Sequence, residues 1–350
     1  MIMQIASKHF ALLITSLILV SGCSASSDNE NQSADGTSST SAPIPPEPTS
    51  LQDLVENSGA AAYWAWKKSS QKVLNSFSIA KTAIVEIGPN TTPDYLSPQI
   101  AIDLASKLYS DHKQNQELTY IYYQHEDTAW AQKKLNDFLG KYIQDWQKEQ
   151  AQSSCRAKDD CFGAVAITHP KKPAGIVLVT ASDAGKKDVN HISGTLEAHE
   201  YTHIIQDESQ GRFLGQVPRW QAEGEAMFAQ AASIYHLDFL SYTVERERII
   251  KELIKNPEIS QSWLVDFINP DTGLTKWEVW DKYPGWRVYD VGMLVTEILA
   301  SLKGPESTIR LSLEVGNGLS YQKAFEKVYG TPWEIAVPLI AQIIYNQINS

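Results

Sequence analysis

The segment His199-Glu200-Tyr201-Thr202-His203 has the form H-E-x-x-H, and the expected fold is organised around it. Apolar residues interspersed with polar ones along this stretch predict a helix. Residues four apart lie on one face of a helix, so the imidazoles of His199 and His203 can reach one cation. Glu200 lies about 100° round the helix from His199, near that cation without binding it. Glu223, further along the chain, is the candidate third ligand, because catalytic zinc takes three protein ligands and one open position.

Glu223 lies within Trp220-Gln221-Ala222-Glu223-Gly224. This segment and the H-E-x-x-H residues resemble the core of the gluzincin zinc metallopeptidases, in which two histidines come from one helix and a glutamate from the next. The resemblance implies a Zn²⁺ ion on His199, His203 and Glu223, a peptide substrate, and Glu200 as the group that takes a proton from a metal-activated water. A short motif also arises by chance, but a matching acid in a second helical context makes chance rarer.

A donor for the oxyanion that forms during attack on a carbonyl is also required. Tyr289, in Tyr289-Asp290-Val291-Gly292, is similar to the oxyanion tyrosine of gluzincin aminopeptidases. The chain has 15 tyrosines, and most tyrosines simply pack with a satisfied hydroxyl, so Tyr283 and His236 remain alternatives.

Gluzincin aminopeptidases also carry a Gly-x-Met-Glu-Asn segment that holds the free amine of the substrate. No stretch of this chain supplies it, Gly163-Ala164-Val165-Ala166-Ile167 included. An endopeptidase is therefore expected rather than an aminopeptidase. The alternatives are a non-catalytic zinc-binding envelope protein that binds a partner, and a zinc hydrolase of a non-peptide bond.

Other polar residues near the motif are weaker candidates. Asp207 follows His203 by one helical turn and either holds a ligand imidazole or is a solvated surface acid. Glu225 lies two residues from Glu223, so it points elsewhere and is left out of the site. His169 and His191 are expected to be loop histidines rather than ligands.

The N-terminus predicts export. Lys8 precedes an apolar run, Phe10 to Val20, which is too short to span a bilayer and is typical of a signal peptide. Leu19-Val20-Ser21-Gly22-Cys23 resembles the lipobox of bacterial lipoproteins, which implies cleavage after residue 22 and lipid on Cys23. Ser24 resembles the outer-membrane sorting pattern. The alternative is an ordinary secretory signal with a chance cysteine.

Composition limits the remaining possibilities. Of 350 residues 43% are hydrophobic, which supports a substantial core, and the net charge of −11 argues against a nucleic-acid partner.

In an exported protein Cys155 and Cys161 are expected to form a disulfide; a metal site is less favoured because no nearby Cys or His completes a tetrahedral set. Residues 24–50 are almost free of apolar side chains and are expected to be a disordered tether.

The expected fold is α+β in one metallopeptidase domain over 51–350, with an α/β subdomain (51–210), a helical subdomain (211–350) and an active-site cleft between them. A small sheet is expected to pack on the H-E-x-x-H helix. The predicted strands are 82–87, 118–123, 164–168 and 175–180. The predicted helices are 96–111, 128–150, 219–235, 237–255, 288–302, 321–329 and 333–349, besides helical structure within 51–82. The resemblance implies that strand 176–179 forms the edge of the sheet, where a peptide docks, although a buried strand has the same pattern.

Overall fold

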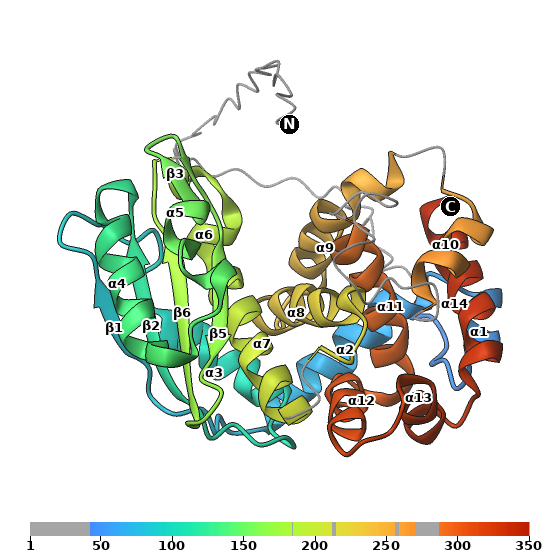
Figure 1. Cartoon of the computed structure of the whole chain (residues 1–350). Coiled ribbons are helices and arrows are strands. Elements are labelled where there is room, and N and C mark those ends of the chain that lie inside the picture. The colour runs from blue at the N-terminus through green and yellow to red at the C-terminus, as the bar shows by residue number, and fades with distance from the viewer. Residues whose placement is uncertain (1–42, 184, 212–214, 256–258, 270–286, 350) are drawn as a thin grey trace, which may run out of the picture. The chain divides into compact units, whose positions relative to one another are not determined.

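The computed structural model describes residues 43–349, apart from 184, 212–214, 256–258 and 270–286 (Figure 1). By its contacts the chain divides into Met1–Ile44 and Pro45–Ser350, and the second unit contains every element described below. Small sheets and many helices make this unit α+β. Cys23, the expected signal peptide and most of the expected tether lie outside the described residues. Within the described part of the chain no helix has the length and apolar character needed to cross a bilayer.

The main sheet has four strands in the order β1-β2-β6-β5. Strands β1 (Ile84–Ile87), β2 (Glu117–Tyr123) and β6 (Ala174–Thr180) are parallel, whereas β5 (Ala164–Thr168) pairs antiparallel with β6. All four strands were predicted, but the expectation that residues 176–179 form the edge is wrong. Strand β6 pairs on both sides, so its apolar run is that of a buried strand, and β5 forms the edge beside it.

Two layers of helices enclose this sheet (Figure 1). Alternate side chains of β2 point to opposite faces, so Leu118, Tyr120 and Tyr122 contact α3 (Pro98–Leu108) and α7 (Thr195–Gln210). Ile121 and Tyr123 join the other core with α4 (Thr128–Leu139) and α5 (Gln150–Ser154). Helix α7 also contacts β5 and β6, so the H-E-x-x-H helix packs directly on the sheet, as expected.

A third core, besides those on the two faces of the sheet, lies among the C-terminal helices. From residue 219 on, the structure contains α8 (Arg219–Ile234), α9 (Phe239–Ile254), α10 (Gln261–Ile268), α11 (Arg287–Lys303), α12 (Glu306–Gly316), α13 (Tyr321–Tyr329) and α14 (Trp333–Ile348). Helices α10 and α12 were not predicted. The N-terminal helices α1 (Leu51–Glu56) and α2 (Ala60–Asn75) pack against α14 and α11 respectively, so the two ends of the described chain share one core.

The predicted helix 128–150 is wrong beyond Leu139. Gly140 has a φ of 54°, in the left-handed region that favours glycine and ends a helix. Short 3-10 turns then lead to α5: η2 (Gly140–Tyr142) and η3 (Asp145–Gln147). Three further short elements were also not predicted, namely η1 (His125–Asp127), η4 (Gly185–Lys187) and α6 (Val189–Ser193).

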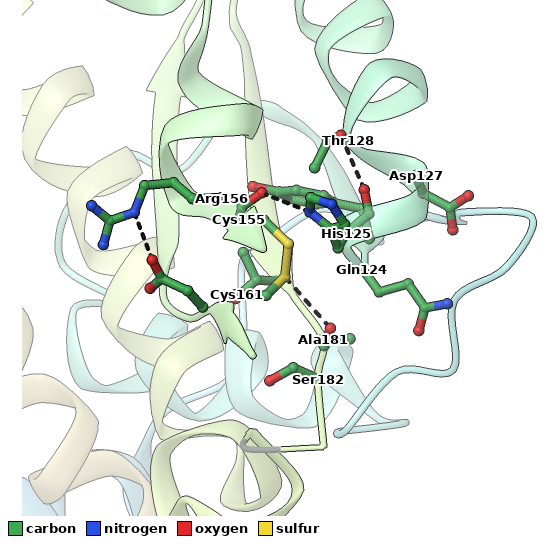
Figure 2. Close-up of a disulfide and its surroundings, with 12 residues drawn as sticks. Gln124, His125, Asp127, Thr128, Cys155, Arg156, Cys161, Ala181 and Ser182 are labelled. Atoms are coloured by element: carbon green, nitrogen blue, oxygen red, sulfur yellow. Dashed lines mark hydrogen bonds and ion pairs between the residues drawn. A yellow bond between two sulfur atoms is a disulfide. The ribbon is translucent and has the colours of Figure 1, made fainter. Parts of the chain in front are cut away.

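The expected disulfide between Cys155 and Cys161 is confirmed (Figure 2). It joins β3 (Cys155–Ala157) to β4 (Asp160–Cys161), a two-stranded sheet that follows α5. The sulfur of Cys161 lies 3.7 Å from the carbonyl oxygen of Ala181, just after β6, and His125 Nδ1 lies 3.3 Å from the carbonyl oxygen of Cys155. The disulfide thus closes a short hairpin, and this hairpin contacts the segments that follow β2 and β6.

Candidate metal centre

Three side chains converge where α7 packs against α8. His199 Nε2 and His203 Nε2 are 3.2 Å apart, and Glu223 Oε2 lies 3.7 Å and 3.4 Å from them respectively. Metal–ligand bonds of about 2.0–2.1 Å at tetrahedral angles require ligand atoms roughly 3.3 Å apart. The three atoms therefore outline one face of a coordination tetrahedron, and the predicted ligand set fits Zn²⁺.

Hydrogen bonds at the far side of each ring determine which nitrogen faces this triangle. His203 Nδ1 lies 2.8 Å from Gln206 Oε1, and His199 Nδ1 lies 3.1 Å from Gln230 Oε1. An amide oxygen only accepts, so both rings carry their proton on Nδ1. The neutral form of each ring therefore has the lone pair of Nε2 in the triangle, where a cation or, in His203, a second proton binds.

The orientation of each glutamine is itself determined by buried acceptors. Gln206 Nε2 donates to the carbonyl oxygen of Ala222 (2.9 Å) and to Glu225 Oε2 (2.7 Å), so its oxygen must face His203. Likewise Gln230 Nε2 donates to Glu245 Oε1 at 2.7 Å. Arg248 in turn pairs with both oxygens of Glu245, at 2.7 and 2.8 Å. Each imidazole is thus supported by an amide, and each amide by a buried carboxylate.

These partners differ from the sequence expectations. Asp207 does not hold an imidazole; its Oδ2 accepts a hydrogen bond from Thr168 Oγ1 at 2.7 Å. Glu225 points away from the ligand triangle, as expected, yet it is fully buried and orients Gln206. Gln206 lies one turn after His203, a spacing from which its role could have been inferred, whereas the role of Gln230 depends on how α8 packs on α7.

Charge is concentrated at the triangle. Burial lowers the pKa of His203, but Glu223, together with Glu200 and Gln206, raises that pKa to about 10. Burial raises the pKa of Glu223, but hydrogen bonds and charge interactions with His199 and His203 lower it more. The pKa of Glu223 therefore lies far below its usual range. Burial raises the pKa of Glu200, whose side chain is only 5% exposed, while the neighbouring histidines oppose this shift.

The edge strand β5 lies beside Glu200. Gly163 pairs with Thr180, and His169 with Ala174, through backbone hydrogen bonds at the two ends of the β5–β6 ladder. Such pairs alternate along an antiparallel ladder with residues whose N–H and C=O groups point outward. The N–H and C=O groups of Ala164, Ala166 and Thr168 therefore point outward, away from β6. The N–H of Ala166 hydrogen-bonds the carboxylate of Glu200 and lowers its pKa.

Tyr289 lies close to the ligand triangle. Its ring centroid is 6.4 Å from that of His199, and burial and then Glu223 raise the pKa of its phenol. Helix α11 brings it there because Gly292 packs against α8 backbone: a Cβ on Gly292 would overlap the carbonyl oxygen of Trp220, and one on Gly224 would overlap Gly292.

Tyr283 and His236 were the two alternatives to Tyr289. Tyr283 lies outside the described residues. His236 Nδ1 lies 2.7 Å from the carbonyl oxygen of Ser233, near the end of α8 that is remote from Glu223. At about 1.5 Å per helical residue the span from Glu223 to Ile234 is roughly 16 Å, which places His236 away from the ligand triangle.

His169 and His191, which were expected to be loop histidines, are not part of the ligand group. His169 packs edge-on against Phe138 and Tyr142, with centroids 5.5 Å apart in both pairs. His191 Nδ1 lies 3.7 Å from Asp94 Oδ2. Among the described residues the only group of three potential metal ligands is His199, His203 and Glu223.

Comparison with known proteins adds no relative: no protein-family model, no curated protein and no solved structure matches this chain. The site is therefore interpreted from its own residues.

Proposed function

We propose that the chain is a zinc-dependent metallopeptidase of the gluzincin type. The observation that carries the proposal is the triangle of His199 Nε2, His203 Nε2 and Glu223 Oε2, with sides of 3.2–3.7 Å. Structural zinc is usually closed by four protein ligands, whereas the described residues offer three here. This difference favours catalysis over a structural role for the metal.

Each residue then has a defined task. A zinc ion held by the three ligands supplies Lewis acidity, which activates a water molecule and polarises the substrate carbonyl. Glu200 accepts the proton of the attacking water while the new C–O bond forms. It gives that proton to the leaving amine as the C–N bond breaks. The hydroxyl of Tyr289 donates a hydrogen bond to the oxygen that becomes negative during attack.

The proposed substrate is an extended polypeptide. The outward N–H and C=O groups of β5, apart from the Ala166 N–H that hydrogen-bonds Glu200, offer a ladder on which a peptide adds as a further strand. Because the chain lacks the amine-binding Gly-x-Met-Glu-Asn segment, we propose cleavage within chains rather than at their ends. We further propose that lipid on Cys23 anchors the enzyme in a bacterial cell envelope, in the outer membrane.

Replacing Glu200 with glutamine tests this function. Glu200→Gln removes the proton carrier without touching a ligand, so we expect zinc content equal to that of the wild type and hydrolysis of a casein-type substrate reduced by a factor of about 10² or more. Glu208→Gln, the same change on the same helix, is the control and retains activity. Undiminished hydrolysis by Glu200→Gln would exclude the mechanism, and a wild-type protein that binds zinc but cleaves no peptide in a library would exclude the function.

A further inference from the structure

Arg219 contacts two residues of the proposed active site at once. It is the first residue of α8, one helical turn before Glu223, and its Nη2 donates to Glu223 Oε1 at 3.0 Å. The same guanidinium hydrogen-bonds the side chain of Tyr289, which comes from α11. The Arg219 and Glu223 side chains are only 18% and 13% exposed.

The two oxygens of Glu223 therefore have different partners. Oε2 faces both ligand nitrogens, at 3.4 and 3.7 Å, whereas Oε1 accepts from the guanidinium. A carboxylate that is free to turn binds a metal through one oxygen or through both. Binding through both would occupy the position that catalytic zinc keeps open for water.

We propose that Arg219 is a positioning residue that keeps Glu223 bound to the metal through one oxygen and orients the hydroxyl of Tyr289. This inference rests on the proposed function. A planar guanidinium suits the task because its donors diverge in a fixed fork and can hold two acceptors together. Lysine presents one point charge and cannot reproduce that geometry.

An ordinary helix-stabilising ion pair is the competing explanation. Arg219 and Glu223 are four residues apart, and exposed pairs at this spacing contribute little to stability. Such a pair has no reason to contact a tyrosine from another helix. Lys133 and Asp137 on α4 form an exposed pair with the same spacing, at 2.6 Å, and provide a matched control.

The test compares Arg219→Met, Arg219→Lys and the control Lys133→Met as full-length proteins loaded with zinc or cobalt. X-ray absorption on the zinc protein counts the light-atom neighbours of the metal, and the visible spectrum of the cobalt protein reports its coordination geometry. In Arg219→Met we expect the neighbour count to rise from about four towards five, because Glu223 becomes free to bind through both oxygens. Peptidase kcat should fall at least about tenfold. Lys133→Met should match the wild type in both measurements.

Arg219→Lys separates the effect of Arg219 on Glu223 from its effect on Tyr289. Its ammonium group can hold Glu223 but not Tyr289 as well, so we expect a wild-type neighbour count with a lower kcat. Unchanged coordination and kcat in Arg219→Met would overturn the inference while leaving the proposed function intact. A wild-type protein without peptidase activity, combined with altered coordination in Arg219→Met, would overturn the function and support the inference. A wild-type protein that binds neither metal would overturn both.

Discussion

At the proposed metal site, a metal ion would compete with a proton for His203. Glu223 raises its pKa to about 10, above the ordinary value of 6.5, so the metal-free protein holds this proton at neutral pH. A raised pKa means that the protonated ring stabilises the metal-free fold below pH 6.5, and that this contribution is lost as pH rises towards about 10. Zinc binds the deprotonated ring, so it must displace the proton.

Zinc uptake should therefore release protons, and its affinity should depend on pH. Between about pH 6 and 8 we expect roughly one proton released from His203 per zinc bound, and an apparent affinity that rises about tenfold per pH unit. Calorimetric titration in buffers of different ionisation enthalpy measures this release. Zinc binding that releases no proton at pH 7 would contradict the raised pKa of His203.

At this scale the sequence predicted that His199 and His203 converge, because a spacing of four residues fixes two side chains on one helix face. The sequence did not predict which side chains hydrogen-bond His199, His203 and Glu223. Gln230 accepts a hydrogen bond from His199 but lies on another helix. Its role therefore depends on helix packing, which no local pattern encodes. Arg219 lies one turn before Glu223 and could have been noticed, but its contact with Tyr289 could not.

At the scale of elements, the crossing of α8 and α11 brings the two halves of the proposed site together. The helices touch backbone to backbone at Gly224 and Gly292, a contact that only glycine allows. Tyr289 lies one turn before Gly292, so its position next to Glu223 and Arg219 depends on this close approach.

Gly292→Ala should therefore damage both stability and activity. The added methyl overlaps the carbonyl oxygen of Trp220 and forces the helices apart, which should lower the free energy of unfolding by about 2 kcal/mol or more. Urea unfolding measures this loss. Gly59→Ala is the control, because a Cβ there meets nothing within 4 Å and its φ of −67° suits alanine. Equal stability of the two variants would show that the crossing tolerates separation.

The elements themselves were largely predictable, but their arrangement was not. Strands β5 and β6 are each apparent from their apolar runs, yet strand order is set by long-range pairing, and this is why the wrong one was expected at the edge. The interruption at Gly140 had a local signal, a glycine within an amphipathic stretch. Helix α12 runs to Gly316, which packs against the backbone of Ser209, a contact between distant parts of the sequence.

On the scale of the whole molecule, the disulfide and the candidate metal centre lie in different cores. Cys155 and Cys161 belong to the core between the sheet and α4, whereas α7 and α8 contribute to the core on the other face of the sheet. Stability and metal binding should therefore respond separately to loss of the disulfide.

Replacing both cysteines with serine should reveal this separation. Closure of the loop between them restricts the unfolded chain by roughly 2 kcal/mol, so the free energy of unfolding should fall by about that amount. Zinc affinity should stay within about twofold of the wild type, because distant sites behave independently. Urea unfolding and a competitive zinc titration provide the two measurements. A parallel loss of zinc affinity would show that the hairpin supports the metal centre.

Amides rather than carboxylates accept the hydrogen bonds of both imidazoles, and this difference would affect the electrophilicity of an ion bound there. A carboxylate behind an imidazole makes the ring a more electron-rich ligand, whereas a neutral amide fixes its orientation and donates little charge. Gln206 and Gln230 place the carboxyl groups of Glu225 and Glu245 one hydrogen bond further from the imidazoles. A dication held by two neutral rings and Glu223 then retains one net positive charge, which favours ionisation of a bound water near neutral pH.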